Sequence, residues 1–276
     1  MRVLDKVLVV TGGGNGIGRE VALELLRRGA RVAAVDVSES GLAQTTALAG
    51  PMEGRLTTHV LDITDRSAVE ALPALVTSDH GAVEGLVNVA GIIHRFVPIG
   101  ELSVDEIERV VAVNFWGTVY MCKAFLPLLQ ARPEATLVNV SSMGALIPFP
   151  GQSAYGATKA AVKLFTEGLI AELRGSTVRT AVVFPGAVGT KMPVNSGVEI
   201  PTPSGSAGRQ PKTTAPDDAG RQIADVIEKG HPALVHRWGC TDDGPILARH
   251  AVAFDRHHRR PDEEDAEHLT CRLVRR

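Results

Sequence analysis

The chain has 276 residues, of which 44% are hydrophobic, 22% are charged and 4% are aromatic. This apolar content is typical of a globular protein and excludes a wholly disordered chain. The 29 Lys and Arg residues nearly balance the 31 Asp and Glu residues, and a formal net charge of −2 disfavours a broad basic surface for nucleic acid. The length is compatible with one domain or two.

Targeting signals and cysteines give further expectations. No apolar run of the sequence approaches the ~18–20 residues needed to span a bilayer, and Asp5 interrupts any signal-peptide pattern at the N-terminus. Cys122, Cys240 and Cys271 lie far apart and fit neither a disulfide framework nor a metal site. We therefore expect a soluble cytoplasmic protein with no metal, no membrane partner and no nucleic-acid partner.

The first 190 residues alternate short apolar runs with longer segments of helical pattern. Strands are predicted at 6–11, 31–36, 56–61, 85–89, 135–141 and 177–184, and helices at 17–28, 39–49, 65–78, 103–131 and 153–174. The strands are almost continuously apolar, as expected for parallel strands that are covered on both faces. The alternation predicts an α/β fold: a doubly wound, mostly parallel sheet with helices on both faces, in three α/β/α layers.

The pattern changes after residue 190. Residues 190–216 are rich in Pro, Gly, Ser and Thr and predict a long lid loop. A helix at 217–229, a strand at 233–236 and a helix at 242–256 are predicted next, followed by a polar tail over 262–276. His250, His257 and His258 match no common metal spacing, so we interpret them as part of a solvated C-terminal extension.

A glycine-rich turn joins the first predicted strand to the first predicted helix. It reads Thr11-Gly12-Gly13-Gly14-Asn15-Gly16-Ile17-Gly18. Glycines allow a tight turn and a close approach of backbone to a pyrophosphate, while the helix N-terminus offers unpaired N–H groups. The turn lacks the Lys-Ser/Thr ending of a P-loop, so we expect a dinucleotide rather than a nucleoside triphosphate.

Asp36 ends the second predicted strand, 18 residues after Gly18. A carboxylate at this position can accept hydrogen bonds from both adenosine ribose hydroxyls and repels a 2′-phosphate. Residues 37 and 38 are not basic, so the sequence favours NAD over NADP as the cofactor. The alternative interpretation of Asp36 is a helix-capping or turn aspartate.

Tyr155 and Lys159 are four residues apart at the start of the predicted 153–174 helix, so they share one face. A tyrosine is a poor base at neutral pH, and a nearby ammonium group and a positively charged nicotinamide would lower its pKa. Ser142 lies at the carboxyl end of the fifth predicted strand, where open α/β sheets bind ligands. These three residues form a candidate acid/base site.

With these motifs the chain resembles the short-chain dehydrogenase/reductase family, in its shorter single-domain branch. The matching segments occur in the family's order: T-G-x-x-x-G-x-G at 11–18, D-I-T at 62–64, N-V-A-G at 88–91, Asn114, N-V-S-S at 139–142, Y-G-A-T-K at 155–159 and P-G-x-V-x-T at 185–190. They cover about residues 5–190. The resemblance implies one Rossmann-type NAD(P)-binding domain over 1–276, in a homodimer or homotetramer that pairs through the 103–131 and 153–174 helices.

The resemblance also implies roles for individual residues. Tyr155 would exchange a proton with the substrate oxygen, and Ser142 would hydrogen-bond that oxygen while Ser141 faces the fold. Lys159 would hold the nicotinamide ribose, and Asn114 would bind a water that relays protons. The remaining cofactor contacts implied are Gly12, Asn15, Gly16, Ile17, Gly18, Asp36, Asp62, Ile63, Asn88, Ala90, Gly91, Pro185, Gly186, Val188 and Thr190.

The implied reaction is the NAD-dependent interconversion of a secondary alcohol and a ketone by hydride transfer. The predicted substrate pocket comprises Ile93, Ser142, Met143, Phe149, Tyr155 and Met192. Its apolar members suit a steroid-, terpenoid- or aromatic-like substrate. We interpret His94 and Arg95 as a solvated loop pair. Two alternatives stay open: a non-catalytic NAD-binding sensor or scaffold, and a sugar-nucleotide epimerase or dehydratase.

Overall fold

A computed structural model describes residues 1–198, 213–230 and 233–235. Its centre is a sheet of seven strands, all parallel, in the order β3-β2-β1-β4-β5-β6-β7. The strands are β1 (Val7–Thr11), β2 (Arg31–Asp36), β3 (Leu56–Val60), β4 (Gly85–Asn88), β5 (Ala135–Val140), β6 (Val178–Phe184) and β7 (Ala233–Val235). The chain reverses its direction across the sheet between β3 and β4, which confirms the doubly wound topology.

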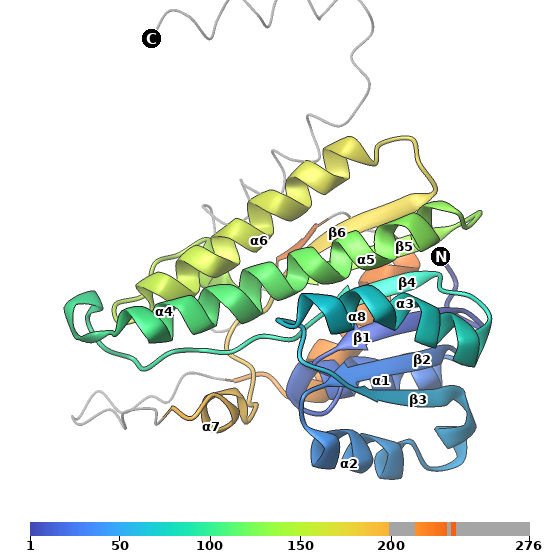
Figure 1. Cartoon of the computed structure of the whole chain (residues 1–276), viewed down its shortest axis with the longest axis horizontal. Coiled ribbons are helices and arrows are strands. Elements are labelled where there is room, and N and C mark those ends of the chain that lie inside the picture. The colour runs from blue at the N-terminus through green and yellow to red at the C-terminus, as the bar shows by residue number, and fades with distance from the viewer. Residues whose placement is uncertain (199–212, 231–232, 236–276) are drawn as a thin grey trace, which may run out of the picture. The chain divides into compact units, whose positions relative to one another are not determined.

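Helices cover both faces of this sheet (Figure 1). One face carries α1 (Gly16–Arg27), α2 (Glu39–Ala49) and α8 (Pro216–Lys229). The other carries α3 (Arg66–His80), α5 (Thr118–Gln130) and α6 (Ser153–Glu172). The expected three-layer Rossmann-type fold is confirmed.

The core explains why the strands are apolar at nearly every position. In β1, Leu8 and Val10 are buried with α1 and α8, whereas Val7 and Val9 are buried with α3, α5 and α6. Successive side chains of a strand point to opposite faces, so a strand covered on both faces has no solvent-facing side to keep polar.

The predicted 103–131 helix has an internal irregularity. It comprises α4 (Val104–Val111), a π-helical turn (Ala112–Gly117) and α5. Ser103 and Glu106 form a capping box at its start. The π turn was not predicted, because one extra residue in a turn leaves no periodic signal; it carries Asn114.

Among the described residues, one helical stretch, Val104–Gln130, is long and apolar enough by length and composition to cross a membrane. In this fold part of its apolar surface belongs to the core: Met121, Phe125 and Leu129 of α5 are fully buried, and α5 packs beside α3.

The predicted lid contains structure that the sequence did not indicate. A short helix, α7 (Met192–Asn195), begins it, and Val188 pairs with Thr214 in an isolated parallel bridge. The rest of the lid (199–212), the predicted helix 242–256, the tail 262–276 and the three C-terminal histidines lie outside the described residues. A single domain over 1–276 therefore stays a prediction.

Candidate active site

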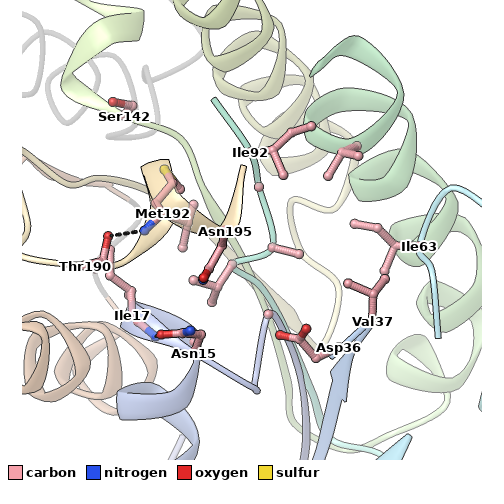
Figure 2. A pocket seen from close by; sticks show the side chains of 18 of the residues that line it. Asn15, Ile17, Asp36, Val37, Ile63, Ile92, Ser142, Thr190, Met192 and Asn195 are labelled. Carbon is pink, nitrogen blue, oxygen red and sulfur yellow. Dashed lines mark hydrogen bonds between the residues drawn. The ribbon is translucent and has the colours of Figure 1, made fainter. Parts of the chain in front are cut away.

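A cavity of about 550 Å³ lies at the carboxyl ends of the parallel strands. Its walls include the residues that follow β1, β2, β4, β5 and β6, such as Gly12, Val37, Val89, Ser141 and Pro185. Figure 2 shows its two ends: Asp36, Val37 and Ile63 lie at one, and Ser142 and Met192 at the other. Open α/β sheets bind ligands at this edge, where the strand order reverses.

The glycine turn forms a cradle that side chains would fill. A Cβ on Gly12 would lie 3.1 Å from the backbone of Ala90, and one on Gly18 would overlap the carbonyl of Gly12. Gly16 has a φ of 50°, a left-handed conformation that favours glycine. Asn15 caps α1, its Oδ1 accepting a hydrogen bond from Gly16 N at 2.7 Å. The cradle and the N-terminus of α1 together fit a pyrophosphate.

Asp36 is held against this turn by two backbone N–H groups. Its Oδ2 accepts from Gly14 N and its Oδ1 accepts from Ser38 N, both at 2.9 Å. Asp36 thus also serves as a turn aspartate, while Ser38 caps α2. Its carboxylate lines the cavity and keeps lone pairs for two ribose hydroxyls.

Tyr155 and Lys159 lie on the first two turns of α6 and line the cavity. Lys159 is buried; its Nζ donates to the carbonyl of Val140 at 3.1 Å and lies 6.0 Å from the centre of the Tyr155 ring. Burial lowers the pKa of Lys159 to about 8. Burial also raises the pKa of Tyr155, and the Ser142 hydroxyl offsets part of that rise. In the protein alone desolvation dominates the pKa of Tyr155. The expected lowering by the ammonium together with a positively charged nicotinamide stays a prediction.

The two adjacent serines have different surroundings. Ser142 Oγ accepts from Gly144 N at 3.1 Å, and a Cβ on Gly144 would lie 3.6 Å from both Ser142 Oγ and Tyr155 Cε1. Ser142 and Tyr155 therefore border the same small space. Ser141 is buried and donates to the carbonyl of Lys159 at 2.7 Å, so its hydroxyl faces the fold as expected.

Asn114 is fully buried in the π turn. Its Nδ2 donates to Ile92 O at 3.0 Å and to Thr158 Oγ1 at 3.1 Å, and its Oδ1 accepts from Ile92 N at 2.8 Å. A Cβ on Gly91 would lie 3.1 Å from Asn114 Oδ1 and 3.2 Å from Lys159 Nζ. The amide and the amine therefore face one common space that only a glycine leaves open.

All the predicted cofactor contacts line the cavity except Asn88. Asn88 is buried, and its Nδ2 donates to Asn139 Oδ1 at 2.9 Å. Asn139 in turn donates to Thr166 Oγ1 at 3.0 Å. Asn88 therefore joins β4 to β5 and α6 inside the core, because the side chain of this strand residue points away from the cavity.

The predicted substrate pocket is only partly assembled. Besides Ser142 and Tyr155, Met192 lines the cavity, but Ile93, Met143 and Phe149 do not. Phe149 is 52% exposed, whereas Met143 is buried in the core. These loop positions could not be oriented from the sequence, since loops have no periodicity that reports burial.

The interpretation of His94 and Arg95 as a solvated pair is wrong for His94. His94 is only 3% exposed, and its Nε2 accepts a hydrogen bond from Tyr155 N at 3.0 Å. Arg95 is exposed and pairs with Glu106 on α4, with two N···O distances of 2.7 Å.

Sequence reasoning missed several lining residues, among them Ile92, Arg109, Val113 and Asn195. Arg109 and Val113 are four residues apart and precede Asn114, so a helical face leading to Asn114 was a usable signal. Asn195 lies on α7, within a segment whose Pro and Gly content indicated a loop.

A dinucleotide cradle beside a half-buried Tyr155 and a buried Lys159 is the arrangement of an oxidoreductase site. Comparison with known proteins agrees: residues 6–199 match the family model described as short chain dehydrogenase. SadH, an oxidoreductase of Mycobacterium tuberculosis, is 36% identical over 236 residues, covering 83% of this chain and 85% of SadH. Levodione reductase of Leifsonia aquatica is 32% identical over 197 residues, covering 71% of this chain and 74% of that protein.

Solved structures give the same result. The crystal structure of levodione reductase has a TM-score of 0.76 at 25% identity, covering 86% of this chain and 98% of that one. A 3-ketoacyl-(acyl-carrier-protein) reductase from Brucella melitensis, complexed with NADH, has a TM-score of 0.75 at 27% identity, covering 84% and 97%. The chain belongs to the short-chain dehydrogenase/reductase family, whose members are oxidoreductases that use a nicotinamide cofactor.

Proposed function

We propose that the protein is an NAD-dependent oxidoreductase that interconverts a secondary alcohol and a ketone. One observation carries this proposal: Ser142, Tyr155 and Lys159 line the same cavity as Asp36, and the buried Asn114 faces Lys159 Nζ across Gly91. The relatives named levodione reductase and 3-ketoacyl-(acyl-carrier-protein) reductase support a carbonyl substrate.

In the proposed reaction, different side chains bind the substrate oxygen, exchange a proton with it and carry that proton away. Ser142 donates a hydrogen bond to the substrate oxygen, and Tyr155 gives that oxygen a proton during reduction or takes one during oxidation. Lys159 lies beside Tyr155 and shares the space at Gly91 with Asn114, which suits a proton path away from the tyrosine. When bound, the nicotinamide supplies or accepts the hydride.

Replacing Tyr155 separates an enzyme from a non-catalytic NAD-binding scaffold. Tyr155→Phe should lower kcat by about 1,000-fold or more, because it removes the acid/base group. NADH binding, followed by fluorescence titration, should change little. Tyr120→Phe is the matched control, since Tyr120 is the only other tyrosine and stacks on Trp116 away from the cavity. Turnover by Tyr155→Phe at the wild-type rate would refute the proposal.

Two groups near the adenosine end support NAD over NADP. The Asp36 carboxylate would repel a 2′-phosphate. Arg19, which follows the glycine turn, already donates to the carbonyls of Gly14 and Gly41 and to the side chains of Gln44 and Thr45. It would have to give up these bonds to meet a phosphate.

The cofactor preference can be measured directly. Wild-type protein should bind NADH at least tenfold more tightly than NADPH, and Asp36→Asn should remove most of that difference. Asp62→Asn, which removes a second carboxylate of the cavity wall, controls for net charge and should keep the preference. Tighter binding of NADPH by the wild type would overturn the assignment of Asp36.

We further propose an apolar substrate, because Ile92 and Met192 line the same cavity as Ser142. Oxidation of four secondary alcohols, testosterone, menthol, 1-phenylethanol and isopropanol, followed as NADH formation, tests this. The bulky apolar alcohols should give the higher kcat/KM, and a preference for isopropanol would contradict the proposal.

Helix α6 lies alongside the continuous stretch of α4, the π turn and α5 (Figure 1). These elements expose apolar side chains, including Val104, Trp116 and Leu164. We propose that this surface pairs two copies of the chain, in a cytoplasmic homodimer or homotetramer. Light scattering should then give a molar mass at least twice the 29.2 kDa of one chain, and Leu164→Glu should lower the measured mass toward that of the monomer.

A further inference from the structure

The N-terminus of α6 depends on a distant residue for its cap. The first N–H groups of a helix have no partner within the helix, and an N-cap side chain normally accepts one of them. Here the N-cap residue is Gln152, whose side chain makes no capping bond. His94 Nε2, 61 residues earlier in the chain, accepts the N–H of Tyr155 instead, at 3.0 Å.

Hydrogen bonding determines the protonation state of His94. Nε2 accepts from a backbone N–H, which can only donate, so Nε2 carries no proton. Nδ1 lies 2.7 Å from the carbonyl of Arg95, which can only accept, so Nδ1 carries the proton. Both ring nitrogens are thus satisfied only by the neutral imidazole. A protonated ring would lose the bond to Tyr155 and place a positive charge at the positive end of the α6 dipole.

Both backbone polar groups of Tyr155 are bound from outside the helical hydrogen-bond pattern. His94 holds its N–H, and the Thr158 hydroxyl donates to its C=O at 2.7 Å. Thr158 accepts in turn from Asn114, which holds both backbone groups of Ile92. The loop containing Ile92 and His94 therefore fixes the position of the first turn of α6 relative to the π turn.

We propose that His94 is a positioning residue for Tyr155, and that turnover requires its imidazole to be neutral. The inference rests on the proposed acid/base role of Tyr155. The charged and titratable residues that the contacts of His94 bring to it are Arg95, whose carbonyl binds Nδ1, and Tyr155, whose N–H binds Nε2; Arg95 in turn pairs with Glu106 on α4. The charge of Arg95 is paired with that of Glu106. The effect of protonating His94 therefore comes mainly from the lost hydrogen-bond acceptor for Tyr155 N and from the positive charge placed at the N-terminus of α6.

Two replacements of His94 test the contact. His94→Leu removes the acceptor, and kcat should fall about 10- to 100-fold, as for a small displacement of a catalytic group, with NADH affinity unchanged within twofold. His94→Gln can place Oε1 where Nε2 lies and cannot gain a proton, so it should recover most of the turnover. His59→Gln on β3 is the control for a histidine-to-glutamine change away from the site, with wild-type kcat expected.

The pH profile distinguishes positioning from a purely structural role. It should be recorded for ketone reduction with NADH, using androstenedione, menthone and acetophenone, because Tyr155 as proton donor stays competent at acid pH. Only the neutral imidazole can accept from Tyr155 N, so wild-type kcat should fall once acid protonates the ring. His94→Gln cannot be protonated there and should lack that fall. An unchanged acid limb in His94→Gln would overturn the requirement for a neutral imidazole.

Amide hydrogen exchange tests the contact without a substrate. Peptides covering residues 150–160 should exchange at least tenfold faster in His94→Leu than in the wild type, and close to the wild-type rate in His94→Gln. Amide exchange at the wild-type rate in His94→Leu would overturn the capping contact. A loss of NADH affinity in proportion to the loss of kcat would overturn the positioning role. If Tyr155→Phe kept its turnover, the proposed function would fail while the exchange result still reported on His94.

Discussion

Lys159 is the buried cation on which the proposed chemistry depends, and its burial has a stability consequence. Its pKa falls from 10.5 to about 8 because the side chain is desolvated. One pKa unit corresponds to about 1.4 kcal/mol, so holding the ammonium charged at pH 7 costs about 3 kcal/mol of folding free energy. Lys159→Met removes this cost and keeps an unbranched side chain of similar size.

The expected gain is smaller than that cost, because the mutation also removes the hydrogen bond to Val140 O, worth about 1 kcal/mol. Lys159→Met should therefore raise the free energy of unfolding by about 2 kcal/mol at pH 7, or Tm by about 4–8 °C. Turnover should be lost at the same time.

The pH dependence gives the sharper test. Between pH 8 and 10.5 the unfolded chain holds a proton that folded Lys159 has released, so wild-type stability rises with pH in this interval. The advantage of Lys159→Met should thus nearly vanish by about pH 9.5. Urea denaturation followed by circular dichroism measures the free energy of unfolding at pH 7 and at pH 9.5. Lys163→Met, one turn further along α6, is the control. No gain at pH 7, or a gain that persists at pH 9.5, would refute the burial argument.

Three further outcomes are expected. Gly220→Ala should destabilise the fold by about 1–3 kcal/mol in thermal denaturation, because its Cβ would lie 2.7 Å from the backbone of α1, whereas Gly168→Ala, with open space around it, should stabilise by up to about 1 kcal/mol. Burial lowers the pKa of His59 and of His80, so stability should fall as the pH drops below about 6.5, and replacing both by Gln should flatten that fall. Without cofactor, phenolate absorbance from Tyr155 should appear only above pH 10, as measured by the ultraviolet difference spectrum against Tyr155→Phe; its appearance near neutrality would contradict the raised pKa.

Local spacing determined much of this protein. The glycine turn, Asp36 and the Tyr155–Lys159 pair were identified from the sequence, because each depends on a short separation within one strand–helix unit. Their convergence also followed from the sequence, since the carboxyl ends of parallel strands meet at one edge of the sheet. Six apolar strand segments that alternate with helices were sufficient to predict the layers.

Tertiary structure decided what no periodic pattern reports. A strand residue can face either side of its sheet. The side chain of Asn88 lies in the core, where it donates to Asn139, and does not line the cavity. The π turn around Asn114 arises from one extra residue per turn and has no distinguishing composition. The cap that His94 provides for Tyr155 joins positions 61 residues apart, and only the folded chain brings a loop imidazole to that helix terminus.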